Sequence, residues 1–228
     1  MKLTYYGHSC FLLETKGKKL LFDPFISPNP LASAIDINSI EADYILITHG
    51  HADHVADAVA IAKNTGALCI SNFEIINWLG AQGVENGHPM NHGGKKEFDF
   101  GVVKYVNAIH TSSMPDGSYG GNPGGFVING ELTIYHAGDT ALTYDMKLLS
   151  EYNAIDVALL PVGDNFTMGL EDAVVAAKFL DCDNIVAMHY DTFDVIKINK
   201  EAGMFMFSQA GKNLTFMEIG ETIELVTT

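Results

Sequence analysis

Short apolar runs dominate the start of the chain and predict β-strands. KLTYY, CFLLET and KLLFD lie within the first 23 residues, and the turn-forming Lys16-Gly17-Lys18 separates the last two. The next run, DYILIT at 43–48, is continuous and rich in β-branched residues, as in a strand that is buried on both faces. It ends where a group of histidines begins, so this strand would deliver the histidines to one edge of a sheet.

The spacing of apolar residues changes to a helical period after the histidines. HVADAVAIAKNTG places Val55, Val59 and Ala62 on one helical face, and Gly66 follows as a C-terminal stop. ALCIS predicts another strand, and NFEIINWLGAQG predicts another helix. The segment 84–100 is rich in Gly, Asn and His, which predicts a loop.

The second half of the chain alternates strands with a helix. VVKYVNAI (102–109), AIDVALLPV and NIVAMH predict strands, and GLEDAVVAAKFL predicts a helix. FVINGELTIY predicts a β-hairpin because Asn129-Gly130 suits a type I′ turn, and the tail NLTFMEIGETIELVT predicts two short strands. Together these elements predict an α/β fold with helices outside the sheets. Since no linker-like shift interrupts the chain, we expect a single domain over residues 1–228.

Composition and charge narrow the class of protein. Hydrophobic residues make up 47% of the 228 residues, which is ample for a buried core, and the formal net charge of −15 argues against tight nucleic-acid binding. No apolar run approaches the ~20 residues of a membrane span, and the start lacks the pattern of a signal peptide. Cys10, Cys69 and Cys182 are odd in number and far apart, which predicts reduced thiols and a cytoplasmic location. A homo-oligomer stays possible.

The segment ITHGHADHVAD (47–57) carries the strongest chemical signal. In its HxHxDH pattern, His49 and His51 lie two residues apart after a strand, so an extended backbone points both rings the same way. Asp53 and His54 come from the turn that enters the helix and can face a second point nearby. Imidazole and carboxylate are preferred donors of zinc, manganese and iron. The pattern therefore predicts a metal centre rather than four separate polar side chains.

Three further candidate ligands each end a predicted strand. They are His110, Asp139 and His189, and ligands in open α/β sheets collect beyond the carboxyl ends of strands. A lone histidine in such a place is more often a hydrogen-bonded structural residue, but the HxHxDH group reverses that balance. An aspartate between two ions can bridge them, and Asp139 is placed for that role. By contrast, His88 and His92 lie in the predicted loop and are expected to be polar loop residues.

At this point the sequence resembles the metallo-β-lactamase superfamily. The matching segments are THGHADH, His110, HAGDT and His189, in that order over nearly the whole chain, and Asp23 in LLFDPF also fits. More narrowly, YYGHSCFLLE, LFDPFISPNP, VGDNFTMG and MHYDTF look like a bacterial branch of metal-dependent hydrolases. That branch is similar to ascorbate-phosphate lactonases and to N-acylphosphatidylethanolamine phospholipase D-like proteins. The resemblance implies an αββα sandwich of two mixed β-sheets flanked by helices.

The resemblance also implies a binuclear site with an assigned set of ligands. The first ion would be held by His49, His51 and His110, and the second by Asp53, His54 and His189, with Asp139 bridging the two. We expect two divalent ions, zinc first, with manganese, nickel or iron as alternatives, because these donors suit several first-row metals.

A mechanism follows from the chemistry of such ions. A bound dication lowers the pKa of water from ~16 to about 7, so a metal-bridged hydroxide can attack a small ester, lactone or phosphodiester. Asp53 is counted among the catalytic residues, and His8 in GHS is the expected proton donor, with His136 as the second candidate. The alternative role for His136, which lies three residues before Asp139, is to support that loop as a hydrogen-bond partner. Asn165 and Thr167 are expected to contact the substrate, unless that loop only forms a turn.

Two other kinds of function are compatible with the same residues. One is a di-iron redox protein on the same fold, and the other is a non-catalytic metal-binding protein. The first usually replaces a loop histidine with glutamate and adds a flavin domain, whereas this chain keeps His51 and is short. Nothing in the sequence favours the second. Ser112 and Ser113 are not expected to be nucleophiles, since no GxSxG elbow surrounds them.

Overall fold

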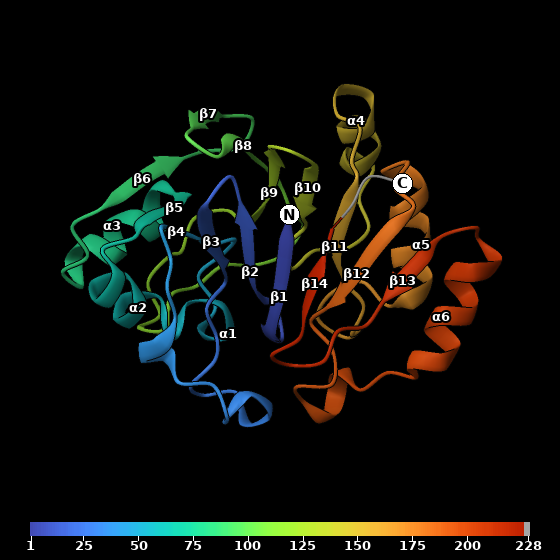
Figure 1. Ribbon diagram of the computed structural model, residues 1–228, viewed down its shortest axis with the longest axis horizontal. Coiled ribbons are helices and arrows are strands. Elements are labelled where there is room, and N and C mark those ends of the chain that lie inside the picture. The colour runs from blue at the N-terminus through green and yellow to red at the C-terminus, as the bar shows by residue number, and fades with distance from the viewer. Residues whose placement is uncertain (226–228) are drawn as a thin grey trace.

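Two seven-stranded sheets face each other in the middle of the molecule, and helices lie outside them (Figure 1). The computed structural model describes residues 1–225. The strand order is β14-β1-β2-β3-β4-β5-β6 in the first sheet and β13-β12-β11-β10-β9-β8-β7 in the second. Both sheets are mixed, and the predicted αββα sandwich is confirmed.

The bounds of the elements are as follows. The first sheet contains β1 (Lys2–Gly7), β2 (Cys10–Thr15), β3 (Lys18–Phe22), β4 (Tyr44–Leu46), β5 (Leu68–Asn72), β6 (Gly87–Met90) and β14 (Thr222–Glu224). The second contains β7 (Lys95–Phe98), β8 (Gly101–Asn107), β9 (Gly124–Asn129), β10 (Thr133–His136), β11 (Val157–Pro161), β12 (Asn184–Met188) and β13 (Asn213–Thr215). The helices are α1 (Ala52–Val55), α2 (Ala58–Thr65), α3 (Phe73–Ala81), α4 (Asp145–Tyr152), α5 (Leu170–Phe179) and α6 (Lys200–Gln209), with short 3₁₀ turns η1 (Pro30–Ala32), η2 (Ile37–Ser39) and η3 (Asp194–Ile196).

The main core lies between the two sheets. Alternate residues of each strand point to opposite faces, so Phe11 and Phe22 of the first sheet meet Phe126 of the second in one buried cluster. A second buried cluster joins the outer face of the first sheet to α2 and α3, where Ile61 and Ile75 pack. Each sheet is thus covered on both faces, which explains the near-continuous apolar runs.

Strand direction determines where the functional side chains gather. In the first sheet β1 and β3 are both antiparallel to β2, and β4 is parallel to β3, so β1, β3 and β4 end at the same edge. In the second sheet β8, β10 and β12 share one direction by the same reasoning. The six strands that precede His8, Asp23, His49, His110, Asp139 and His189 therefore run toward common edges.

Several local predictions needed correction. The hairpin β9–β10 forms, but Asn129 pairs with Thr133 and leaves a three-residue loop, and neither Asn129 nor Gly130 has a positive φ, so the type I′ turn is wrong. Segment 84–100 is not all loop, because β6 and β7 lie in it as edge strands whose exposed residues carry no apolar pattern. The helix after the histidines is split into α1 and α2, with Asp57 between them. The closing strands form, although the prediction for the tail extends past residue 225, outside the described residues.

Candidate metal centre

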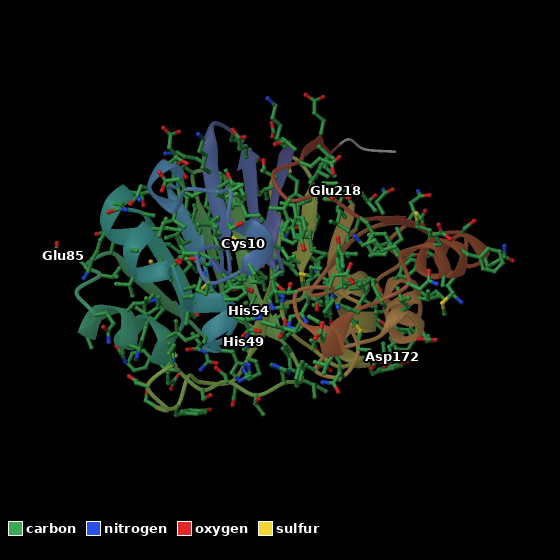
Figure 2. The ribbon with its side chains drawn as sticks, turned by 90° about the horizontal axis from the view of Figure 1, so that it is seen from below. Cys10, His49, His54, Glu85, Asp172 and Glu218 are labelled. Atoms are coloured by element: carbon green, nitrogen blue, oxygen red, sulfur yellow. The ribbon has the colours of Figure 1, made fainter. Side chains whose placement is uncertain are left out.

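The seven ligands expected from the sequence lie together at one edge of the sandwich. Figure 2 shows His49 and His54 in the middle of this edge, between the teal ribbon of α2–α3 and the orange ribbon of the C-terminal part. Side-chain donor atoms within 4.8 Å of one another form three groups: His49, His51 and His110; His49, His54 and Asp139; and Asp53, His54 and His189 together with His8. The first triad and the last set are called the first and second ligand groups below, and the middle triad links them, because it joins Asp139 to His49 of the first and His54 of the second. Two ligand groups linked through one aspartate are the arrangement expected of a two-ion centre.

Asp139 occupies the middle of this arrangement. Its Oδ2 lies 2.9 Å from Nε2 of His189, 3.3 Å from Nε2 of His54, 3.6 Å from Nε2 of His110 and 3.8 Å from Nε2 of His49. The Nδ1 of His51 lies 3.1 Å from Nε2 of His49. One carboxylate thus faces histidines of both ligand groups.

Buried polar groups support residues 48–54, called the metal loop below, from behind. Asp23 accepts hydrogen bonds from the backbone N–H and the hydroxyl of Thr48, and its Oδ2 lies 2.9 Å from Nδ1 of His54. The Thr48 hydroxyl lies 3.0 Å from Nδ1 of His49. A histidine whose Nδ1 is engaged in this way presents Nε2 to the ion, which is the usual arrangement around metals in proteins.

The backbone turns into the left-handed region at three strand ends of the centre. His8 (φ +56°), Asp23 (φ +41°) and His189 (φ +55°) are the first residues after β1, β3 and β12. Residues other than glycine seldom adopt this conformation, and such strain concentrates at functional sites. All three residues belong to the cluster or contact it: His8 and His189 lie in one group of donor atoms, and Oδ2 of Asp23 lies 2.9 Å from Nδ1 of His54.

Two glycines allow the loops of the centre to approach each other. A Cβ at Gly163 would overlap the carbonyl oxygen of His189, and a Cβ at Gly138 (φ +63°) would lie 2.8 Å from Cβ of Thr48. Gly138 directly precedes Asp139, and Gly163 belongs to the loop after β11. Any side chain at either position would push apart segments that carry ligands.

Charges within the cluster favour metal binding by most of the histidines. Burial, and then the charge of His54, holds the pKa of His49 well below 6.5, and burial also lowers the pKa of His51 and of His110. These rings are neutral at neutral pH and offer a lone pair. Burial opposes a proton on His54 too, but the carboxylates of Asp139 and Asp23 raise its pKa well above 6.5. A dication would take over the charge that this proton supplies.

Unpartnered buried atoms show that the residues fit a bound ion. Within residues 1–225, Asp139 Oδ1, His54 Nε2 and His189 Nδ1 are buried without a hydrogen-bond partner. Leaving such groups unpaired costs about 1–3 kcal/mol each. Coordination would satisfy the Asp139 oxygen and the His54 nitrogen, so the donor set fits divalent metal ions.

Two expected site residues lie elsewhere in the structure. His136 is fully buried, its Nε2 lies 3.2 Å from the carbonyl of Ser9, and its Nδ1 accepts the N–H of Gly138. Its ring stacks on Phe22 in the core, so it supports the loop before Asp139 and offers no nitrogen to a substrate. Asn165 is exposed and lines a hollow of about 410 Å³ whose wall contains none of the candidate ligands.

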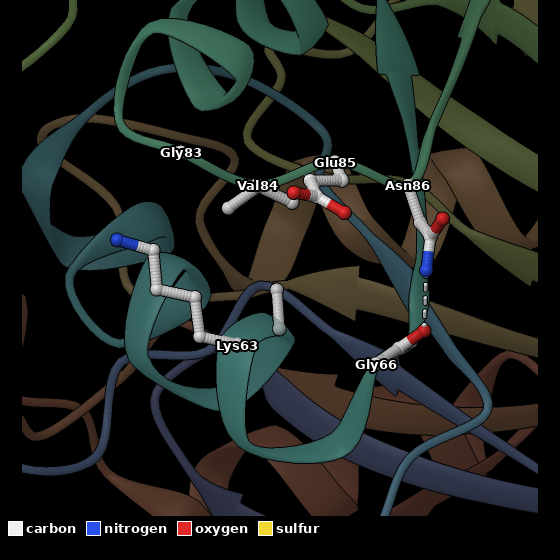
Figure 3. A pocket seen from close by; sticks show the side chains of 8 residues that line it. Lys63, Gly66, Gly83, Val84, Glu85 and Asn86 are labelled. Carbon is white, nitrogen blue, oxygen red and sulfur yellow. Dashed lines mark hydrogen bonds between the residues drawn. The ribbon is translucent and has the colours of Figure 1, made fainter.

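The polar residues that were not expected in the site make contacts within the fold. His88 lies on β6, and Nε2 of His92 lies 2.9 Å from the carbonyl of Pro123. The Ser112 hydroxyl accepts the N–H of Gly50 and donates to the carbonyl of Gly120, which ties the 110–125 loop to the metal loop. A hollow of about 180 Å³ lies between the end of α2 and residues 83–86, and no histidine lines it. The side-chain amide of Asn86 donates a hydrogen bond to the carbonyl of Gly66 beside it (Figure 3). The hollow holds none of the candidate ligands.

Sequence reasoning missed Thr192 and saw only part of the role of Asp23. The Thr192 hydroxyl lies 3.0 Å from Nδ1 of His8, although Thr192 follows β12 and His8 follows β1. A threonine in a polar loop carries no distinctive pattern. The MHYDTF segment was a signal of family resemblance, but it did not indicate which of its residues acts.

Replacement of Asp23 by Asn is expected to weaken metal binding by about 10–100-fold, the usual cost of losing a partner behind a ligand. The amide keeps the volume but removes the charge that faces Nδ1 of His54. Titration against a competing chelator measures the affinity. Asp43→Asn is the matched control, since Asp43 also accepts a backbone N–H, from Lys19, but at an exposed position. Equal affinities in the Asp23 variant and the unmodified protein would contradict this role.

Comparison with known proteins agrees with this geometry. A model of the β-lactamase superfamily domain matches residues 2–189. A UPF0173 metal-dependent hydrolase from Flavobacterium johnsoniae is 58% identical over 226 residues, covering 99% of this chain and 100% of the relative. One from Christiangramia forsetii is 57% identical over 227 residues, with the same coverage. The solved structure of Igni18, a metallo hydrolase from Ignicoccus hospitalis, is 36% identical, covers 97% of each chain and gives a TM-score of 0.88.

The chain therefore belongs to the metallo-β-lactamase superfamily, among its metal-dependent hydrolases. The family resemblance of the sequence is confirmed. Among residues 1–225, no helix combines the length and apolarity that crossing a membrane requires.

Proposed function

We propose that this protein holds two divalent ions and hydrolyses a small ester, lactone or phosphodiester. The observation that carries the proposal is the position of Asp139, whose Oδ2 lies within 3.8 Å of four histidine nitrogens from two ligand groups. His49, His51 and His110 would hold the first ion, and Asp53, His54 and His189 the second. Zinc is the first expectation, with manganese, nickel and iron as alternatives.

The ions, when bound, supply a water whose pKa is lowered to about 7 and a Lewis acid for the substrate oxygen. The residues around the ions determine the side from which a substrate can reach them. His51, Asp53 and His110 are the more accessible members of the cluster, with 27% of the Asp53 side chain and 13% of the His110 side chain exposed. The substrate would therefore approach from the side of these three residues, while His49, His54 and Asp139 stay buried.

The contacts of His8 argue against its role as proton donor. Its side chain is buried, Nε2 faces Asp53 and Nδ1 faces Thr192, so no ring nitrogen is free for a leaving group. Burial, and then the neighbouring His189, lower the pKa of His8 to about 4, although the hydrogen bond with Asp53 opposes this. A ring that is neutral at neutral pH is a poor acid. We therefore assign the leaving-group proton to water.

We also propose that residues 1–228 act as one domain in a reducing compartment such as the cytoplasm. The three cysteines are buried free thiols, which supports this proposal. A small-molecule substrate suits the acidic surface better than a polyanion does.

A substrate panel tests the proposed function. The protein is stripped with a chelator, reloaded with Mn²⁺, Zn²⁺ or Ni²⁺, and assayed with generic esters, lactones and phosphodiesters. We expect turnover of at least one class, loss of that turnover after stripping, and its return on reloading. Activity that survives complete metal removal would refute the proposal, and silence of the loaded protein across a broad panel would favour a non-catalytic role.

A further inference from the structure

His8 joins the second ligand group from a strand that carries no other candidate ligand. Its Nε2 lies 3.2 Å from Oδ2 of Asp53, and its ring centroid lies 4.1 Å from that of His189. One donor atom each of His8, Asp53, His54 and His189 lies within 4.8 Å of the other three. Atoms that share one ion at about 2.1 Å lie within about 4.2 Å of one another, so only small shifts would complete the set.

The Thr192 hydroxyl is placed to hold the proton of His8 on Nδ1 when an ion binds Nε2. The Thr192 hydroxyl donates its single proton to the carbonyl of Tyr190 at 3.3 Å, and its oxygen lies 3.0 Å from Nδ1 of His8. In that arrangement the oxygen accepts the N–H of Nδ1, and the neutral ring offers the lone pair of Nε2 to an ion beside Oδ2 of Asp53. Without an ion, the opposite tautomer donates from Nε2 to Asp53 and accepts the Thr192 hydroxyl at Nδ1.

We propose that His8 is itself a ligand of the second ion, and that Thr192 positions its ring for that purpose. This inference rests on the proposed two-ion centre. It raises the protein donors of the second position to five, namely His8, Asp53, His54, His189 and the bridging Asp139. The first position has four: His49, His51, His110 and Asp139.

The two positions therefore differ in the ion that they suit. Zinc in proteins is almost always bound by four ligands, or by three and a water, which matches the first position. Five protein donors and a water make a six-coordinate site, a number that zinc seldom takes in proteins but that octahedral first-row ions such as manganese do take. By coordination number the second position would accordingly suit manganese better than the first does, and its three imidazoles also suit iron and nickel.

The variants His8→Asn and Thr192→Val test the inference. Asparagine tolerates the left-handed backbone of residue 8 but is too short to replace the ring. Valine keeps the shape of Thr192 and removes the acceptor for Nδ1. We expect His8→Asn to weaken binding of the second Mn²⁺ ion by about 100-fold and Thr192→Val by about tenfold, with the first ion unaffected. His88→Asn, which changes a histidine on β6, is the matched control.

Two measurements that do not depend on activity test whether His8 binds the second ion. Calorimetric titration gives the affinity of each ion, and a crystal structure of the Mn²⁺-loaded protein shows whether Nε2 of His8 lies within coordination distance. Bonding of Nε2 to the ion together with selective loss of the second ion supports the inference. Two bound ions with Nε2 donating to Asp53, and unchanged affinity in His8→Asn, overturn it while leaving the two-ion centre intact. An unmodified protein that binds no ions overturns both.

Discussion

Asp139→Asn is expected to lower turnover at least a thousandfold and to weaken binding at both metal positions. The substitution keeps the shape of the side chain but removes its charge, and Oδ2 of Asp139 faces histidine nitrogens of both ligand groups. The electrostatic stabilisation that a metal gives to a transition state is worth several kcal/mol, and about 4 kcal/mol corresponds to a factor of a thousand. Turnover of the substrate found in the panel and metal content by elemental analysis are the two measurements.

The matched control for this variant is Asp183→Asn. Asp183 pairs with Lys212 at the surface, and 65% of its side chain is exposed. We expect this control to keep both metal content and turnover. If Asp139→Asn retained turnover within tenfold with two bound ions, the bridging role would be wrong, and the two ligand groups would have to act separately.

The fold and the convergence of the candidate ligands could be predicted because their signals are local. HxHxDH places four ligand-type side chains within six residues, and the apolar run of β4 ends two residues before them. His110, Asp139 and His189 follow strands that share a direction, so a sheet brings them together without further information. The sequence alone could not place a histidine at this edge unless a predicted strand came directly before it.

The contacts of His8 and His136 could not be predicted in the same way. Strand periodicity says that neighbouring side chains point to opposite faces, but Ile134, Tyr135 and His136 are all buried, so the pattern does not tell which face meets the metals. His136 stacks on Phe22 in the core. His8 meets Thr192 from 184 residues away along the chain, a pairing that only the packing of the two sheets creates.

Edge strands and turns escaped prediction for a related reason. The residues of β7 are mostly exposed, so they show no apolar alternation, and the strand is held by its pairing with β8. The hairpin after β9 uses three residues although Asn129-Gly130 suits a two-residue turn, because the pairing of Asn129 with Thr133 sets the register. In both cases long-range pairing overrides the local preference.

Asp53→Ala is expected to remove the second ion, leave the first bound, and lower turnover at least a hundredfold, or about 3 kcal/mol. Asp53 belongs to the second ligand group and lies on the accessible side of the cluster. Asp53 is ionised at neutral pH. Burial opposes its charge, but the hydrogen bond with His8 and the charge of His54 hold the pKa of Asp53 below 3.8. Metal content and turnover are measured on the same preparation, and undiminished turnover in a variant of verified metal content would refute the mechanism.

The double variant that combines Asp53→Ala with His8→Asn tests whether both side chains bind the ion at the second position. If both side chains serve the same ion and Asp53→Ala already removes it, His8→Asn has nothing further to weaken, and the double variant should be little worse than Asp53→Ala alone. Independent roles would instead multiply the two losses. The single and double variants, compared for turnover and second-ion affinity, therefore report whether β1 and the metal loop act on one ion.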